Sequence, residues 1–288
     1  MYPAMKLLVC VVAIAACQNE SKLDTVAHAA PLVAADPPPA DLEARVDRIE
    51  RRLDKVIAVL DQALPSEPDP DETYSVAIDP VDPVQGPSDA KVTIVEGFEF
   101  LCPYCYMVNP TVDEVLQKYP KDVRLVSKYL LIHGEPAIAP GMLACAAAKQ
   151  GKFKEIKAAL WSHLFKLEGD RPTVQPDQIA PDNLVKIAAD AGLDATKLKA
   201  DMDGIDCKGW IQSSEASLHP VGASGTPAFF INGRYINGAQ PIEAFDAIIK
   251  EELAKADKAI ADGVAPADYY EREIVAKGIT RVKGRFED

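Results

Sequence analysis

The feature that most limits what this chain can fold into is a pair of cysteines, Cys102 and Cys105, at a junction between two kinds of segment. Residues 91–100 form an apolar run typical of a buried strand, and residues 107–119 have helical spacing. A thiolate at a helix N-terminus is stabilised by free backbone N–H groups and the helix dipole. We therefore predict that Cys102 is an attacking thiol and that Cys105, one turn further in, is the resolving thiol.

The remaining segments predict an α/β fold. The expected elements are short strands at 74–78 and 123–132, a helical block over about 136–222 that is broken at 169–172 and at Gly192, a hairpin of 228–232 and 234–237 across Asn232-Gly233, and a long helix over 241–262. The order β-α-β, helical block, β-β-α corresponds to a thioredoxin-like fold with an inserted helical domain. Residues 263–288 form a polar tail to which we assign no structure.

The N-terminus has the pattern of an export signal. Lys6 precedes an apolar run at 7–16, which is too short to span a bilayer and suits a signal peptide. The run ends in Ile14-Ala15-Ala16-Cys17, which resembles the bacterial lipobox, whose cysteine is lipidated. We predict a lipoprotein signal peptide at 1–17 with lipidation of Cys17, and a lipid-anchored location on the periplasmic side of the bacterial cell envelope, where disulfides persist. The alternative is a plain secreted protein cleaved after Ala27-His28-Ala29.

A heptad pattern follows a linker rich in alanine, proline and acidic residues at 18–40. Its apolar positions are Leu42, Val46, Ile49, Leu53, Val56, Leu60 and Ala63. This spacing predicts a coiled-coil helix over 41–64 and a homo-oligomer, followed by a second linker at 65–73. The alternative is a single helix that packs on its own domain.

Two motifs carry a resemblance to a known family. Phe98-Glu99-Phe100-Leu101-Cys102-Pro103-Tyr104-Cys105 is similar to the active-site segment of the DsbA-like thioredoxin family, and Ser224-Gly225-Thr226-Pro227-Ala228-Phe229-Phe230-Ile231-Asn232-Gly233 is similar to its cis-proline loop. The resemblance covers roughly residues 74–262. It implies that the bond to Pro227 is cis and that this loop lies beside Cys102. Substrate would then be held by the backbone of Thr226 and by the surface near Pro103 and Tyr104.

The same resemblance implies roles for four more residues. Glu96 matches a buried acid of the family, which can relay a proton to or from Cys105, and Lys128 matches a lysine found near that acid. The alternative is an ordinary surface acid and lysine. Cys145 and Cys207 match the places where some relatives have a second disulfide, the alternative being two buried free thiols.

This resemblance implies dithiol–disulfide exchange on unfolded or misoxidised exported proteins, with a membrane redox partner. Thr226 before the proline, and Pro103-Tyr104 without a histidine, resemble the isomerase and reductase branches, so we favour these over an oxidase. The alternatives of another class are a copper-handling chaperone that uses the two thiols as soft ligands, and an envelope lipoprotein whose coiled coil is the working part.

Composition excludes several other classes. The net charge of −13 argues against a nucleic-acid partner, which requires a basic face. The chain has no glycine-rich phosphate loop, so no organic cofactor is implied. A zinc site is disfavoured because no second C-x-x-C exists and the four histidines are scattered, so we expect no metal. An inert structural Cys102–Cys105 disulfide is the remaining alternative.

Overall fold

A computed structural model describes residues 41–63 and 67–283, and the chain divides into two units, Met1–Val56 and Ile57–Asp288. Helix α1 (Leu42–Ala63) matches the predicted range, and its heptad side chains Val46, Ile49, Leu53 and Val56 are exposed. The predicted signal peptide, Cys17 and the first linker lie outside the described residues. Within the described ranges, no helix is both long and apolar enough to cross a membrane.

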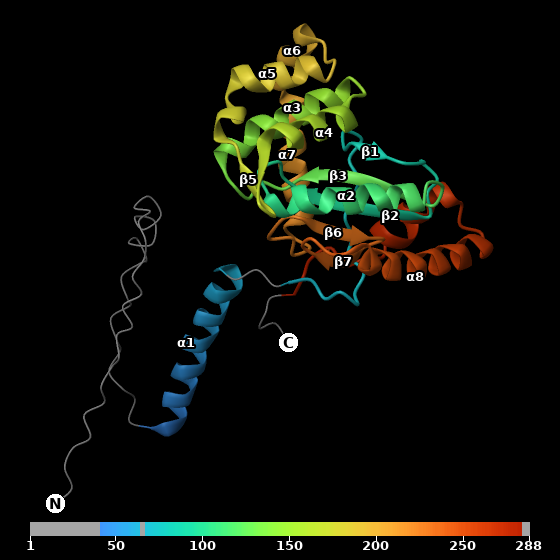
Figure 1. The fold of residues 1–288 in the computed structure, drawn as a ribbon. Coiled ribbons are helices and arrows are strands. Elements are labelled where there is room, and N and C mark those ends of the chain that lie inside the picture. Colours follow the sequence, from blue (N-terminus) through green and yellow to red (C-terminus); the bar gives the residue numbers. More distant parts are fainter. Residues whose placement is uncertain (1–40, 64–66, 284–288) are drawn as a thin grey trace, which may run out of the picture. The chain divides into compact units, whose positions relative to one another are not determined.

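The second unit is built on a five-stranded sheet in the order β1-β3-β2-β6-β7 (Figure 1). The strands are β1 (Val84–Gln85), β2 (Val92–Phe98), β3 (Val123–Tyr129), β6 (Ala228–Ile231) and β7 (Arg234–Asn237). Strand β2 pairs parallel with β3 and antiparallel with β6, and all its residues are buried. Residues Asn232 and Gly233 turn between β6 and β7 with positive φ, as the predicted hairpin requires.

Helices α2 (Pro103–Lys118) and α8 (Ile242–Ala261) cover one face of this sheet. Their contribution to the core is Val108, Val112 and Val115 from α2 and Phe245 and Ile249 from α8, packed on Val92, Ile94, Val123, Leu125, Phe229, Ile231 and Ile236. The opposite face meets the end of α7 (Ile205–Leu218) and the C-terminal segment. The element order and the sheet confirm the thioredoxin-like fold.

The helical insertion joins β3 to β6 and lies beside the sheet (Figure 1). Its elements are η1 (Glu135–Ala137), α3 (Ile138–Lys149), α4 (Phe153–Leu164), β4 (Phe165–Glu168), β5 (Arg171–Val174), η2 (Pro176–Ile179), α5 (Pro181–Asp190), α6 (Ala195–Asp203) and α7. The predicted break at 169–172 lies within a hairpin of β4 and β5, two strands that the sequence analysis did not predict. Gly169 has φ +65° in the turn, and Pro172 lies on an edge strand, where a missing N–H is tolerated.

Three further expectations need correction. The segment 74–78 forms only an isolated bridge from Tyr74 to Ile279, because its backbone hydrogen bonds are with the β6–β7 turn at Gly233 and with the C-terminal segment rather than with a strand of the sheet. The C-terminal tail is ordered through η3 (Pro266–Asp268) and the π-helical turn η4 (Tyr270–Val275) because Tyr270 and Ile274 are buried. Helix α2 begins at Pro103 rather than at residue 107, because proline suits the first helical turn.

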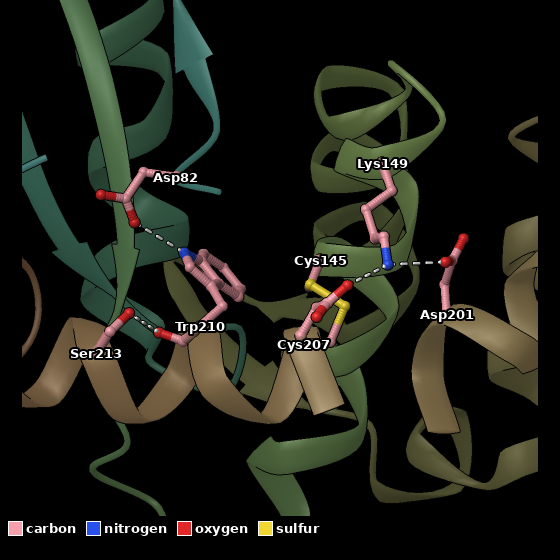
Figure 2. Close-up of a disulfide and its surroundings, with 8 residues drawn as sticks. Asp82, Cys145, Lys149, Asp201, Cys207, Trp210 and Ser213 are labelled. Atoms are coloured by element: carbon pink, nitrogen blue, oxygen red, sulfur yellow. Dashed lines mark hydrogen bonds and ion pairs between the residues drawn. A yellow bond between two sulfur atoms is a disulfide. The ribbon is translucent and has the colours of Figure 1, made fainter. Parts of the chain in front are cut away.

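A disulfide joins α3 to α7 through Cys145 and Cys207, whose Cα atoms are 5.5 Å apart (Figure 2). Lys149 lies beside it and forms ion pairs with Asp201 and Asp206. The crosslink therefore closes a long segment of the insertion on itself.

Removing this disulfide is expected to destabilise the protein. The cysteines are 62 residues apart, and the chain-entropy relation gives about 4 kcal/mol for a loop of this length. We expect the double variant Cys145→Ala/Cys207→Ala to lose roughly that much free energy of unfolding in urea titration. A loss below about 1 kcal/mol would show that the crosslink contributes little.

Candidate active site

The N-terminus of α2 is built around Cys102. This residue is the N-cap, with extended backbone (φ −82°, ψ 116°), and its sulfur accepts a hydrogen bond from the backbone N–H of Cys105 at 3.4 Å. Pro103 occupies the first turn of the helix, where its missing N–H costs nothing. Both cysteines are reduced and buried. The strand–loop–helix path therefore places the two sulfurs at one helical end.

The two thiols differ in acidity. The pKa of Cys102 falls to about 6. The largest cause is a hydrogen bond from the Cys105 side chain. Hydrogen bonds from the backbone N–H groups of Cys105 and Tyr104 lower the pKa further, and burial of the thiol opposes these effects. Burial is the main cause that raises the pKa of Cys105 well above its ordinary value, and the adjacent Cys102 sulfur adds to it. Cys102 is thus the thiolate near neutral pH, and Cys105 remains protonated.

The loop before β6 closes over the nucleophile. The Thr226–Pro227 peptide bond is cis, and the Cys102 sulfur lies 3.2 Å from the carbonyl oxygen of Thr226, to which its protonated form donates a hydrogen bond. Pairing of β6 with β2, in which Ala228 is opposite Gly97, brings this loop to the active-site end of the sheet. The structure thus brings together the two motifs singled out in the sequence.

A third predicted residue, Glu96, lies below the cysteines in β2. Its carboxylate is fully buried, and its Oε2 lies 2.8 Å from the ammonium nitrogen of Lys157 in α4. The prediction that Lys128 lies near Glu96 is wrong. In the β2–β3 register Glu96 is opposite Ser127, while Lys128 is opposite Gly97. Since adjacent side chains of a strand point to opposite faces, Lys128 points away from Glu96.

Lys128 instead forms a buried ion pair with Asp82, at 2.6 Å, on the other face of the sheet. The indole N–H of Trp210 donates to the second oxygen of Asp82 at 3.0 Å, a contact visible in Figure 2. Both oxygens of Asp82 are therefore satisfied, and this network ties α7 to the segment before β1.

Sequence reasoning also missed Glu99, a buried acid just before the cysteines. One of its carboxylate oxygens accepts hydrogen bonds from the backbone N–H groups of Ile132 and His133, at 2.6 and 2.9 Å, and the other contacts the His133 ring. Its own backbone oxygen accepts from the N–H of Cys102 at 3.3 Å. Glu99 therefore holds the segment after β3 against the active-site turn. An acid within the apolar run 98–101 was the available signal.

Lys157 was missed for a related reason. It lies on the apolar face of α4, between Phe153, Ile156, Leu160 and Trp161, and is only 5% exposed. A lysine on the buried face of a helix requires a partner, but the sequence alone does not say which acid faces it.

Comparison with known proteins agrees with this geometry. A family model described as thioredoxin matches residues 79–251 of the chain. This chain belongs to the thioredoxin family. Within it the resemblance to DsbA-like members is confirmed: the chain is 26% identical to the thiol:disulfide interchange protein DsbA of Pseudomonas syringae, over 50% of this chain and 64% of that protein.

Further relatives extend this picture. The chain is 34% identical, over 62% of its length, to part of the Na(+)/H(+) antiporter NhaA 3 of Salinispora tropica, and the match spans only 26% of that protein. Among solved structures, a thioredoxin-like oxidoreductase from Silicibacter pomeroyi has a TM-score of 0.52 and 28% identity, covering 62% of this chain and 94% of that one. BdbD from Bacillus subtilis, at 19% identity, shares the fold with a TM-score of 0.54, over 64% of this chain and 99% of that one.

Proposed function

We propose that this protein catalyses thiol–disulfide exchange through Cys102 and Cys105. The observation that carries the proposal is the capping of α2 by Cys102, whose pKa is lowered to about 6 while a protonated Cys105 lies within hydrogen-bonding range. A thiolate at this position attacks a disulfide sulfur, and a second thiol is in place to resolve the product.

The reductive direction runs in two steps. The Cys102 thiolate attacks one sulfur of a client disulfide, so that a mixed disulfide forms and the other client sulfur leaves as a thiolate, which takes a proton from solvent. Cys105 then loses its proton and attacks Cys102, which forms the Cys102–Cys105 disulfide and releases the second client thiolate. The client gains two electrons, and the pair of cysteines loses them. Oxidation of a client is the same path in reverse.

We propose that the clients are unfolded or misoxidised exported proteins. Three large apolar side chains are exposed on α2 and in the insertion hairpin: Tyr104, Met107 and Leu167. Such side chains suit apolar segments that folded proteins bury. Thr226, a partly buried residue beside Cys102, offers main-chain pairing to an extended chain. A membrane redox partner would renew the cysteines by the same chemistry.

For direction, we propose an isomerase or reductase, on the basis of Thr226 and of Pro103-Tyr104 without a histidine. The alternative is an oxidase, and one observation favours it. The lowered pKa of Cys102 stabilises the reduced protein and so makes the disulfide more oxidising. Refolding of a scrambled-disulfide substrate distinguishes the two: an isomerase restores its activity without added oxidant, and an oxidase acts only on the reduced substrate.

We propose that the chain works at the periplasmic side of the envelope, anchored by a lipid at Cys17. The lipobox-like sequence supports this location. The intact mass of the mature protein tests it, since an unmodified N-terminus at Ala30 would exclude the lipid.

We also propose that α1 joins copies of this chain in a coiled coil. Its heptad side chains, Val46, Ile49, Leu53 and Val56, support the proposal, because they are exposed on the helix and form the apolar seam that a coiled coil buries. We expect sedimentation of the soluble chain to show an oligomer that becomes a monomer when residues 41–64 are deleted or when Leu53 is replaced by lysine. The matched control is Leu53→Ile, which keeps the apolar seam. A monomer in every case would reject the coiled coil.

The test of the exchange function itself is insulin reduction by the full chain in the presence of a reductant. Tight Cu(I) binding without any exchange would favour the copper-handling alternative.

A further inference from the structure

We propose that Lys157 is a positioning residue of the redox site: its ammonium keeps the Glu96 carboxylate ionised and ready to take the proton of Cys105. The helical insertion would then take part in the resolving step, beyond covering the sheet. This inference rests on the proposed exchange function.

The contact between Lys157 and Glu96 is buried on both sides. Lys157 is 5% exposed and Glu96 is fully buried, with 2.8 Å between ammonium nitrogen and carboxylate oxygen. The ammonium also lies over the rings of Phe98 and Trp161, 4.9 Å from each centroid. A charge that is buried in this way must be compensated, and a nearby cation favours the ionised form of a carboxyl. The geometry therefore pairs the Lys157 ammonium directly with the carboxylate of Glu96.

The second carboxylate oxygen of Glu96, Oε1, is buried and has no hydrogen-bond partner among the described residues. Cys105 is buried on α2, which packs on the face of the sheet to which Glu96 points. Beyond burial and the Cys102 sulfur, the charge of Glu96 contributes to the raised pKa of Cys105, so the two groups interact. Glu96 thus combines a free oxygen with a neighbouring thiol that must lose its proton.

The other charged and titratable groups around Glu96 have interaction partners of their own. Glu99 is bound to the backbone at residues 132 and 133, and the Tyr129 hydroxyl donates to the Ala137 carbonyl oxygen at 2.7 Å. Lys128 and Asp82 pair with each other on the opposite face. Within residues 67–283, Glu96 forms its ion pair with Lys157.

The proton transfer completes the exchange chemistry. In the mixed disulfide between a client and Cys102, the Cys105 proton moves to the carboxylate of Glu96. The Cys105 sulfur attacks Cys102, the new S–S bond forms, and the client thiolate leaves and is protonated by solvent. Glu96 then returns its proton to solvent. Burial disfavours the charged form of a carboxyl and a nearby ammonium favours it, so removal of the Lys157 ammonium is expected to hinder the transfer of the proton to Glu96.

The experiment follows the reaction of the reduced full chain with Ellman's reagent, which separates the two steps. A first release of the coloured thiolate reports attack by Cys102, and a second reports attack by Cys105 on the mixed disulfide. For Lys157→Met we expect the second release to be at least about tenfold slower at pH 7 and to recover as the pH is raised. The first release keeps the wild-type dependence on pH. The conservative variant Lys157→Arg is expected to restore the second release.

Two controls separate this role from a structural one. Lys128→Met removes an equally buried lysine from an equivalent ion pair on the opposite face, and it should leave the second release unchanged. The double variant Glu96→Gln/Lys157→Met should be no slower than Glu96→Gln. If Lys157→Met does not fold, Lys157→Gln keeps a hydrogen-bond donor without the charge and is expected to show the same slowing.

The outcomes are distinct. A wild-type second release in Lys157→Met or Lys157→Gln would overturn the role of Lys157. Slowing of equal size in Lys128→Met would also overturn it. Absence of the first release in the wild-type chain would instead refute the proposed exchange function.

Discussion

Replacing Cys102 by serine is expected to abolish insulin reduction, and replacing Cys105 by serine is expected to turn the protein into a trap. A serine hydroxyl is not ionised near neutral pH and cannot attack a disulfide, so Cys102→Ser removes the first step. Cys105→Ser leaves the nucleophile of α2 in place but removes the thiol that resolves its product. A covalent adduct between Cys102 and the client should therefore accumulate, measurable by intact mass and lost on reduction.

The matched control is the double variant Cys145→Ala/Cys207→Ala, assayed where it remains folded. Cys145 and Cys207 form their own disulfide between α3 and α7, so this variant keeps both Cys102 and Cys105 and should reduce insulin and form no lasting adduct. The assignment of roles would be contradicted if Cys105→Ser formed no adduct while Cys102→Ser did.

The second large effect is a dependence of stability on pH in the reduced protein. The folded-state pKa of Cys102 is about 6, against about 8.5 for an unfolded cysteine. Because the folded pKa is lower, the stabilisation is fully present above the unfolded pKa and is lost as the pH falls through 6. Linkage gives about 3 kcal/mol at pH 8.5, about 1.4 kcal/mol at pH 7 and almost nothing at pH 5.

The measurement is urea unfolding of the reduced protein and of Cys102→Ser at these three pH values. We expect the difference between the two to grow with pH by roughly these amounts, and the alkylation rate of Cys102 to rise with a midpoint near 6. A difference that is constant with pH, together with an alkylation midpoint near 8.5, would show that the thiol is not activated. The same stabilisation at pH 7 corresponds to about 30 mV in the potential of the pair.

Much of the fold could be predicted because its signals are local. The apolar run of β2, the turn at Asn232 and Gly233, and the spacing of α8 each depend on residues close in sequence. The site followed from two motifs, which the pairing of β2 with β6 brings together.

The partner of Glu96 could not be predicted, because it depends on strand register and on a distant helix. A shift of one residue in the β2–β3 pairing would have put Lys128 on the face of Glu96, and the sequence does not fix that pairing. Lys157 is 61 residues from Glu96 and reaches it through the packing of the insertion. The ordered C-terminal segment escaped prediction similarly, because Tyr270 is buried by contacts with distant parts of the chain, including the carbonyl oxygen of Val76.

The most direct test of the central claim is equilibration of the full chain with glutathione buffers of defined potential, followed by mass mapping of the disulfides. We predict that a Cys102–Cys105 disulfide forms in a two-electron transition at a potential above about −300 mV, the range of labile catalytic pairs. The Cys145–Cys207 disulfide should remain intact throughout this transition. If Cys102 and Cys105 stay reduced across the series, or are already joined at potentials below about −300 mV like a structural crosslink, the redox function proposed for this pair is wrong.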